Sequence, residues 1–251
     1  MLGANFMRKN IFIILFILIV LFGSGQVGVK AVDNDLKKNY NEVELNFFRG
    51  KTSLADLEAK LNDLIVDLNN MDDDYEKFYY RGKSNFILGE IADIQNKKEK
   101  AIDYYESAQK SAEKAMEYEE KSDVYNLIGK SYIRLLNNKG AFYAISNGQK
   151  TFDLINKAIE LDEKNYSVYN SLGMIYLQAP KIGGGDINKS EEALIKALNS
   201  DREIDNFISY YYLAKVYEKK EDENRAENHR KKAKDIFPDS YYLKIINEIN
   251  N

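Results

Sequence analysis

The sequence predicts an all-helical protein made of stacked helix pairs. Apolar residues recur at helical spacing, as in residues 54–68 (LADLEAKLNDLIVDL), where leucine and isoleucine fall at positions i, i+3, i+4 and i+7. No stretch alternates with a sustained period of two, and the chain of 251 residues contains only two prolines. One pattern of aromatic and small residues also recurs along the chain, and such internal repetition is typical of repeat proteins.

The N-terminal segment has the features of a secretory signal. Arg8 and Lys9 precede an unbroken apolar run over residues 11–22, and Ala31 offers a small residue for cleavage. The run is shorter than the roughly 20 residues that a membrane-spanning helix needs. We expect residues 1–31 to be a signal peptide and the mature protein to be periplasmic or in the cell envelope. The alternative is an uncleaved signal anchor, which would be the protein's only attachment to a membrane.

Residues 32–72 are expected to form a helix hairpin that caps the start of the stack. Its second helix is the amphipathic segment beginning at Leu54. Thr52 or Ser53 is a suitable N-cap for this helix, and Asp56 lies near its positive end.

The repeated pattern is clearest in residues 210–238. Its positions in order are Tyr210, Leu213, Ala214 and Tyr217 on one helix, Ala226, Arg230 and Ala233 on the next, and Pro238 at the end. This arrangement resembles the tetratricopeptide repeat (TPR), although Arg230 stands where that family has an aromatic residue. The spacing of 12 residues from Ala214 to Ala226 is also the family's spacing.

Three upstream segments carry the same pattern. The corresponding positions are Phe78, Arg81, Gly82, Ala101, Tyr105 and Ala108; then Tyr125, Ile128, Gly129, Tyr132, Thr151, Ile155 and Ala158; then Tyr169, Leu172, Gly173, Tyr176, Ser190, Leu194 and Ala197. Small residues such as Gly129 and Gly173 allow two helices to approach closely, and large ones fill the gap to the next helix. The resemblance implies about four TPR-like repeats in 73–238, forming a right-handed superhelical solenoid, with a C-terminal capping helix at 239–251.

Three of the four repeats are longer than the family's pattern. The spacing from the small residue of the first helix to the first patterned residue of the second helix is 12 in the last repeat. It is 19 residues from Gly82, 22 from Gly129 and 17 from Gly173. The extra residues fall between the first and second helix each time. We therefore expect insertions along one edge of the solenoid.

The stretch GGGDINKS (183–190) resembles a phosphate-binding loop. Gly183, Lys189 and Ser190 match three of its four fixed positions, but Asn188 replaces the second glycine. A phosphate loop follows a strand, whereas a helix is expected here, and Asp186 would repel an anion. We interpret the stretch as an insertion that leaves one helix and caps the next through Asp186.

Other candidate chemistry is sparse. A chain without cysteine has no disulfide, thiolate zinc site or cysteine nucleophile. His229, the only histidine, lies in a charged stretch and is expected to be solvated surface. Residues 71–74 (MDDD) lack the spacing of a calcium loop and are expected to cap the next helix. We expect no enzyme activity, no cofactor and no metal site.

The net charge argues against nucleic acid as a partner. Removing the three basic residues of 1–31 from the net charge of −4 leaves about −7 on the mature chain. A mildly acidic exported protein is a poor candidate for binding nucleic acid.

The resemblance implies that partners bind the concave groove formed by the first helices of the repeats. In each first helix, the residues one and five places after the leading aromatic residue lie four positions apart and share one face. Arg134 lies one turn further on. The groove residues predicted in this way are Tyr79, Lys83, Asn126, Lys130, Arg134, Asn170, Met174, Tyr211 and Lys215. Aromatic, amide and basic side chains together suit an extended peptide or an acidic tail.

Two functions remain open. The first is an exported scaffold for protein–protein interaction that binds a peptide through the groove. The second follows from the AP…GGD loop after Tyr176, which is similar to loops of the T component of periplasmic solute transporters. It implies an accessory subunit of solute uptake that binds a small ligand or a transport partner near residues 139–149 and 179–186, where Phe142 and Tyr143 offer a hydrophobic contact. Alternatively, these two side chains pack on the neighbouring hairpin.

Overall fold

The computed structural model describes residues 35–243, and these residues form helices and connecting turns without a strand. The predicted signal peptide, and the predicted capping helix beyond residue 243, lie outside the described residues. The chain divides into two compact units, the first ending at Asn41 and the second beginning at Glu42. Residues 35–41 of the first unit are helical.

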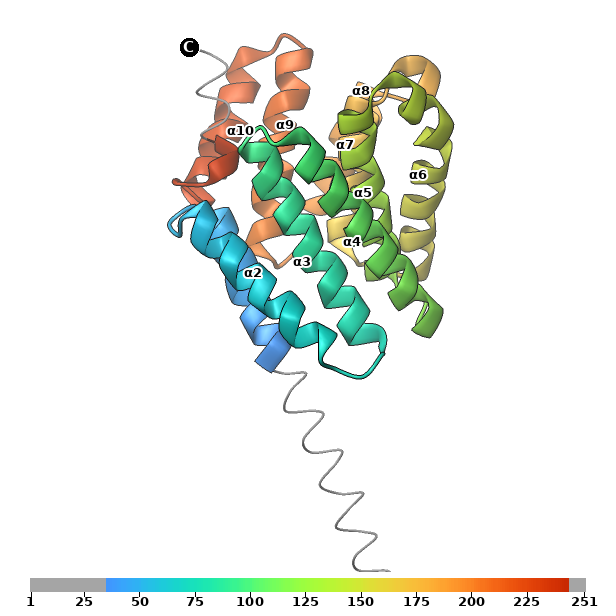
Figure 1. Ribbon diagram of the computed structural model, residues 1–251. Coiled ribbons are helices and arrows are strands. Elements are labelled where there is room, and N and C mark those ends of the chain that lie inside the picture. The colour runs from blue at the N-terminus through green and yellow to red at the C-terminus, as the bar shows by residue number, and fades with distance from the viewer. Residues whose placement is uncertain (1–34, 244–251) are drawn as a thin grey trace, which may run out of the picture. The chain divides into compact units, whose positions relative to one another are not determined.

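The second unit begins with helical residues 42–49 and continues with a regular series of helices (Figure 1). In chain order they are α2 (Leu54–Asn69), α3 (Tyr75–Ile94), α4 (Lys98–Tyr118), α5 (Ser122–Lys139), α6 (Ala141–Leu161), α7 (Tyr166–Gln178), the 3-10 helix η1 (Lys181–Gly183), α8 (Ile187–Ala197), α9 (Glu203–Lys219) and α10 (Glu223–Ile236).

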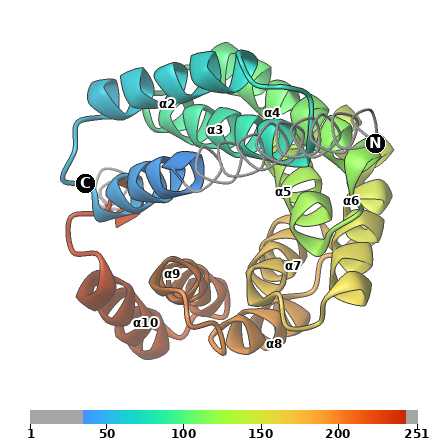
Figure 2. The same cartoon turned by 90° about the horizontal axis from the view of Figure 1, so that it is seen from below.

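Successive helices form antiparallel pairs that stack along a curve. The helices of α3–α4, α5–α6, α7–α8 and α9–α10 pack mainly on each other. Figure 2 shows α3, α5, α7 and α9 on the inner side of the curve, with α4, α6, α8 and α10 outside them. The prediction of an all-α solenoid of stacked helix pairs is confirmed.

Small residues permit close contact within the pairs, as predicted. A Cβ atom added to Gly173 in α7 would lie 2.5 Å from Cγ of Leu194 in α8. The same addition to Gly129 in α5 would lie 2.9 Å from Cγ1 of Ile155 in α6. Real Cβ atoms are not found this close to another carbon atom, so glycine sets the separation of these helices.

The sequence predicted insertions between the first and second helices of three repeats. In the first two of these repeats, the extra residues are instead part of the helices. Only residues 95–97 separate α3 from α4, and only Gly140 separates α5 from α6. The helices themselves are long instead, with 20 and 21 residues in the first pair and 18 and 21 in the second. Helical sequence continues without a breaker up to each turn, so the added length extends both helices. Only the third insertion, residues 179–186, is a connection outside the α-helices, and it contains the 3-10 helix η1.

The loop within GGGDINKS has the predicted capping role. The Asp186 carboxylate accepts hydrogen bonds from the backbone N–H groups of Asn188 at 2.9 Å and Lys189 at 3.2 Å. These bonds lower the pKa of Asp186. Gly184 adopts a φ of +89°, a left-handed conformation that favours glycine. The cap uses the same backbone donors that a phosphate would need.

Two other predicted helix starts are confirmed. The Ser53 hydroxyl accepts a hydrogen bond from the backbone N–H of Asp56 at 3.1 Å. The Asp74 carboxylate, from the MDDD stretch, accepts one from the backbone N–H of Lys77 at 2.7 Å.

Helical residues 42–49 lie on the inner side of the curve, where the groove was predicted. Phe48 stacks on Tyr242 with ring centroids 5.6 Å apart and contacts Phe207 of α9 edge-on at 6.0 Å. Phe47 is completely buried. The buried aromatic side chains hold this short helix against the C-terminal end of the stack.

No helix within residues 35–243 has both the length and the apolar character that crossing a membrane requires.

Candidate binding site on the concave face

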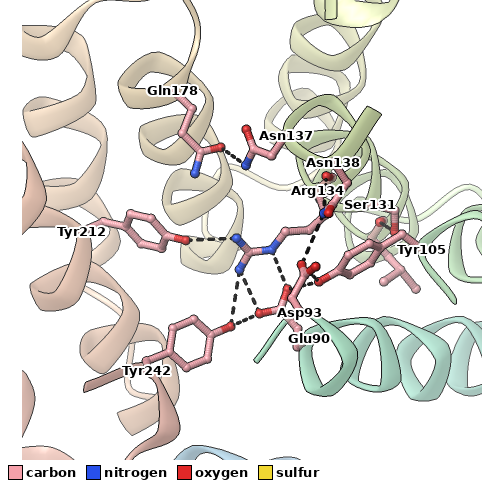
Figure 3. A network of polar contacts seen from close by, with 11 residues as sticks. Glu90, Asp93, Tyr105, Ser131, Arg134, Asn137, Asn138, Gln178, Tyr212 and Tyr242 are labelled. Atoms are coloured by element: carbon pink, nitrogen blue, oxygen red, sulfur yellow. Dashed lines mark hydrogen bonds and ion pairs between the residues drawn. The ribbon is translucent and has the colours of Figure 1, made fainter. Parts of the chain in front are cut away.

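A buried ion pair crosses the concave face between α3 and α5 (Figure 3). The Arg134 guanidinium donates two hydrogen bonds to the Glu90 carboxylate, from Nε at 2.5 Å and from Nη2 at 2.9 Å. The side chain of Glu90 is 5% exposed and that of Arg134 is 14% exposed. A bidentate pair removed from water in this way is geometrically specific. We call the group formed by Glu90, Arg134, Tyr212 and Tyr242 the partition.

Two tyrosines extend this pair across the inner side of the curve. The Tyr212 hydroxyl of α9 lies 3.4 Å from Nη1 of Arg134, and the Tyr242 hydroxyl lies 3.4 Å from Nη2. Tyr242 also donates a hydrogen bond to Glu90. The partition therefore connects α3 and α5 with α9 and the C-terminal segment (Figure 3).

Glu90 of the partition and Asp93 share a further tyrosine. The Tyr105 hydroxyl of α4 lies 3.0 Å from Glu90 and 2.7 Å from Asp93. Burial raises the pKa of Asp93, although the hydrogen bond from Tyr105 opposes the rise. Asn138 adds a long contact of 3.4 Å to Asp93.

The partition separates two hollows of the concave face. Arg134, Tyr212 and Tyr242 line both of them. One, the inner cavity, has a volume of about 90 Å³ and is also lined by Glu44 and Phe48 of helical residues 42–49. The other, the outer cleft, is much larger at about 610 Å³ and more open.

The inner cavity has polar walls. Asn126 Oδ1 accepts a hydrogen bond from Ser171 at 2.6 Å, and Asn170 Oδ1 accepts one from Ser209 at 2.8 Å. Lys130 points its ammonium group at the face of the Phe86 ring, 4.4 Å from the centroid. Burial lowers the pKa of Lys130 to about 8.

The outer cleft combines aromatic, amide and charged side chains. Beyond the partition it is lined by Asp93, Ile94, Leu177, Gln178, Tyr211, Lys215, Glu218 and Lys219. The ammonium group of Lys215 lies 5.0 Å from the centroid of the Tyr211 ring. Gln178 accepts a hydrogen bond from Asn137 at 2.9 Å, which joins α7 to α5 at the rim.

The structure places all nine predicted groove residues along these two hollows. Tyr79, Lys83, Asn126, Lys130, Asn170 and Met174 line the inner cavity, Tyr211 and Lys215 line the outer cleft, and Arg134 lies between. Their accessibility differs from that of an open groove, because Asn126, Asn170, Met174 and Tyr211 are buried. Arg134, predicted as a groove cation, forms an ion pair with Glu90.

Sequence reasoning missed the other members of the partition. Glu90 lies seven residues after Lys83 on α3, so extending the predicted groove face by two turns would have found it. Tyr212 follows Tyr211, which was predicted. Tyr242 lies outside the repeats, and no local pattern marks it.

His229 is not the solvated surface residue that the sequence indicated. Its ring stacks on Tyr217 at 5.2 Å and on Tyr210 at 5.8 Å, so that it is half-buried. Burial lowers the pKa of His229. In the described part of the chain, no group of His, Asp and Glu side chains is arranged to hold a metal ion.

The insertion edge carries exposed apolar side chains. Phe142 in the first turn of α6 is 90% exposed, so it does not pack on the neighbouring hairpin. Tyr143 is half-buried, with the ammonium group of Lys139 4.8 Å from its ring centroid. Ile182 in η1 is fully exposed.

No known protein-family model matches the sequence, and no curated protein matches it. Several solved structures are similar to the chain. YrrB, described as a TPR protein with an unusual peptide-binding site, is 16% identical, with a TM-score of 0.40 over 84% of this chain and 90% of its own. MamA is 18% identical, with a TM-score of 0.39 over 73% and 88%. BtubC from P. vanneervenii is 17% identical, with a TM-score of 0.43 over 82% and 80%. Identities this low concern the fold and not the function.

Proposed function

We propose that the chain is an exported scaffold that binds a short segment of a partner protein in the outer cleft. The observation that carries this proposal is the composition of the cleft. Tyr211, Tyr212 and Tyr242 line the cleft, the hydroxyls of Tyr212 and Tyr242 being held by Arg134 and Glu90, and Gln178 and Lys215 add polar side chains. Tyrosine and mixed polar groups at a concave surface are typical of peptide recognition.

The size of the cleft limits the partner to a short segment. Its volume of about 610 Å³ falls in the range of roughly 300–1,000 Å³ that is usual for binding pockets. Helical residues 42–49 fill the inner side of the curve beyond the partition, so a long extended peptide would have to displace Phe47 and Phe48, which are buried. A few residues of a partner can bind without disturbing this packing.

Lys215 makes an acidic partner segment the best candidate. Among the described residues, no carboxylate pairs with its ammonium group. Two other cations of the cleft are engaged, because Arg134 binds Glu90 and Lys219 donates to the backbone oxygen of Leu177 at 2.7 Å. A carboxylate of the partner would pair with Lys215 above the Tyr211 ring.

Capture experiments with matched charge variants test this proposal. Lys215→Glu reverses the charge in the cleft, and Lys157→Glu makes the same change on the outer helix α6, where the lysine side chain is 44% exposed. The full chain and both variants are used to capture proteins from an envelope extract. We expect one protein to bind the wild type and the Lys157 variant and to be lost from the Lys215 variant. Equal capture by all three, or loss from both variants, rejects the outer cleft.

The proposed compartment is the periplasm or cell envelope. Its support is the charge and apolar pattern of residues 1–31. Fractionation of cells that express the full chain tests it, and recovery from the cytoplasm at full length would refute it.

The second candidate function is an accessory subunit of solute uptake that binds a small ligand. The inner cavity favours it, because this hollow is smaller and less open than the outer cleft and has amide and charged side chains in its wall.

A further inference from the structure

The first half of α6 is a helix surface that the rest of the stack leaves uncovered. α6 has 21 residues, whereas α7 and α8 of the next pair have only 13 and 11. No residue within 141–150 is buried, and burial in α6 begins at Thr151. The next pair is therefore too short to cover the start of α6, which leaves Phe142 90% exposed and Ile145 82% exposed.

A further exposed apolar side chain lies at the same end of the stack. Because the helices of each pair are antiparallel, the turns within the pairs all fall at one end, which is the insertion edge (Figure 1). The 3-10 helix η1 belongs to this edge and packs on α6. A Cβ atom added to Gly184 would lie 3.2 Å from the ring of Phe152, so the connection is fixed against α6. Ile182 is nevertheless fully exposed.

These three side chains project from turns and do not line a hollow together. Exposed apolar groups gathered on one part of a surface mark contact with a protein or with a membrane. A protein partner needs a pocket shaped to each projecting side chain, whereas the fluid interface of a bilayer admits such side chains without a preformed shape. The geometry therefore favours a lipid surface.

The charge around the exposed side chains points to the same kind of surface. The segments 137–152 and 173–185 contain no aspartate or glutamate, and their charged residues are Lys139, Lys150 and Lys181. The chain as a whole has a net charge of −4. This local excess of lysine is complementary to anionic lipid headgroups, and lysine stems can lie along an apolar surface while their ammonium groups stay in water.

The carboxylates nearest to this edge are engaged by other groups. Glu106 of α4 forms an ion pair with Lys139. Glu113 accepts a hydrogen bond from Gln109 at 2.8 Å, Asp153 accepts one from Gln149 at 2.8 Å, and Asp186 caps α8.

Three lysines at this edge remain available to a partner. Among residues 35–243, Lys98 and Lys181 form no ion pair with a carboxylate. Lys98 lines a shallow hollow of about 650 Å³ together with Phe142. Lys150 donates a hydrogen bond to the Tyr132 hydroxyl at 2.7 Å, which leaves its charge unneutralised.

We propose that the insertion edge binds the surface of an anionic phospholipid bilayer. Phe142, Ile145 and Ile182 enter the interface, and Lys98, Lys150 and Lys181 lie beside the phosphate groups. This inference does not rest on the proposed capture of a partner segment, which takes place in the outer cleft. The two proposals therefore succeed or fail separately.

Tryptophan fluorescence of the full chain tests the proposal, because the sequence contains no tryptophan. Phe142→Trp introduces a single reporter at the insertion edge. Ile195→Trp is the matched reporter, because Ile195 is 51% exposed and lies near the end of α8 that is remote from this edge. A reporter at a defined position also separates contact at the edge from any attachment through residues 1–31.

Vesicles of phosphatidylglycerol and of phosphatidylcholine are added to each reporter protein. We expect the emission of the Phe142→Trp protein to move to shorter wavelength with phosphatidylglycerol and less with phosphatidylcholine. The emission of the Ile195→Trp protein should not move with either lipid. Absence of a shift at position 142, or equal shifts of the two reporters, overturns the proposal. A shift that follows protein concentration and not lipid also overturns it and assigns a second copy of the chain as the occupant.

Substitutions in the Phe142→Trp background test the individual side chains. Ile145→Ser together with Ile182→Ser should raise the lipid concentration needed for half of the shift by about tenfold or more, because two apolar side chains no longer leave water. Lys98→Gln together with Lys181→Gln should remove the preference for phosphatidylglycerol. Lys215→Glu in the outer cleft should leave the lipid titration unchanged. A titration that neither the serine nor the glutamine pair alters overturns the proposal.

Discussion

Replacing Arg134 with methionine tests how strongly the partition stabilises the fold. The change keeps much of the side-chain length but removes two hydrogen bonds to Glu90, at 2.5 and 2.9 Å. Hydrogen bonds to a charged group contribute about 1.5–3 kcal/mol each, and breaking a buried ion pair from one side costs about 3–5 kcal/mol. Glu90 is only 5% exposed, and although Tyr105 and Tyr242 would still donate hydrogen bonds to it, no positive charge would remain beside its carboxylate. We therefore expect the free energy of unfolding to fall by about 3–5 kcal/mol.

Urea and thermal unfolding followed by far-UV circular dichroism measure this loss. For a domain of this size, the expected decrease in Tm is roughly 6–20 °C. The control is the double variant Arg134→Met with Glu90→Gln, which removes both charges and keeps an acceptor for Tyr242. It should be more stable than the single Arg134 variant, because no buried charge is left unpaired. A single-variant loss below about 1 kcal/mol, or a double variant that is less stable still, would refute this account of the partition.

Three further predictions concern other parts of the stack. Gly173→Ala should destabilise the protein by about 1–3 kcal/mol, because the added Cβ would lie 2.5 Å from Cγ of Leu194. Gly148→Ala, whose added Cβ would have no atom within 4 Å, should instead stabilise α6 by up to about 1 kcal/mol. Equal effects of the two changes in chemical denaturation would contradict the packing argument. Asp186→Ala should cost about 0.5–2 kcal/mol through loss of the α8 cap, again measured by denaturation, and an unchanged midpoint would contradict it. Burial lowers the pKa of His229, so its protonation opposes folding. The free energy of unfolding should therefore fall as the pH drops from 7 to 5, and His229→Gln should make that decline less steep. An identical dependence on pH for both proteins would count against the burial effect.

Much of the fold could be predicted because its signals are local. Residues 54–68 show helical spacing, and Ser53 and Asp186 were recognised as caps from a few neighbouring residues. The recurrence of Gly129 and Gly173 in equivalent positions predicted the close helix pairs. Each of these features depends on residues within one or two helical turns.

The candidate site was predictable only in part. Helical periodicity identified one face of each inner helix, and the nine residues on it do line the concave side. Periodicity does not say what lies opposite that face. Glu90 pairs with Arg134 across 44 positions of sequence, and Tyr242 reaches Glu90 across 152. Neither contact has a local sequence signature.

The sequence by itself determined that this protein is a series of amphipathic helices, where many of them begin, and which faces they bury. These properties follow from local propensity and from the spacing of apolar and small residues. Only the tertiary structure decided that helical residues 42–49 fill the inner side of the curve and that the partition divides the concave face into an inner cavity and an outer cleft. That outcome depends on the packing of distant segments such as Phe48 against Tyr242. The stacking angle of successive helix pairs brings those segments together, and no single pair encodes that angle.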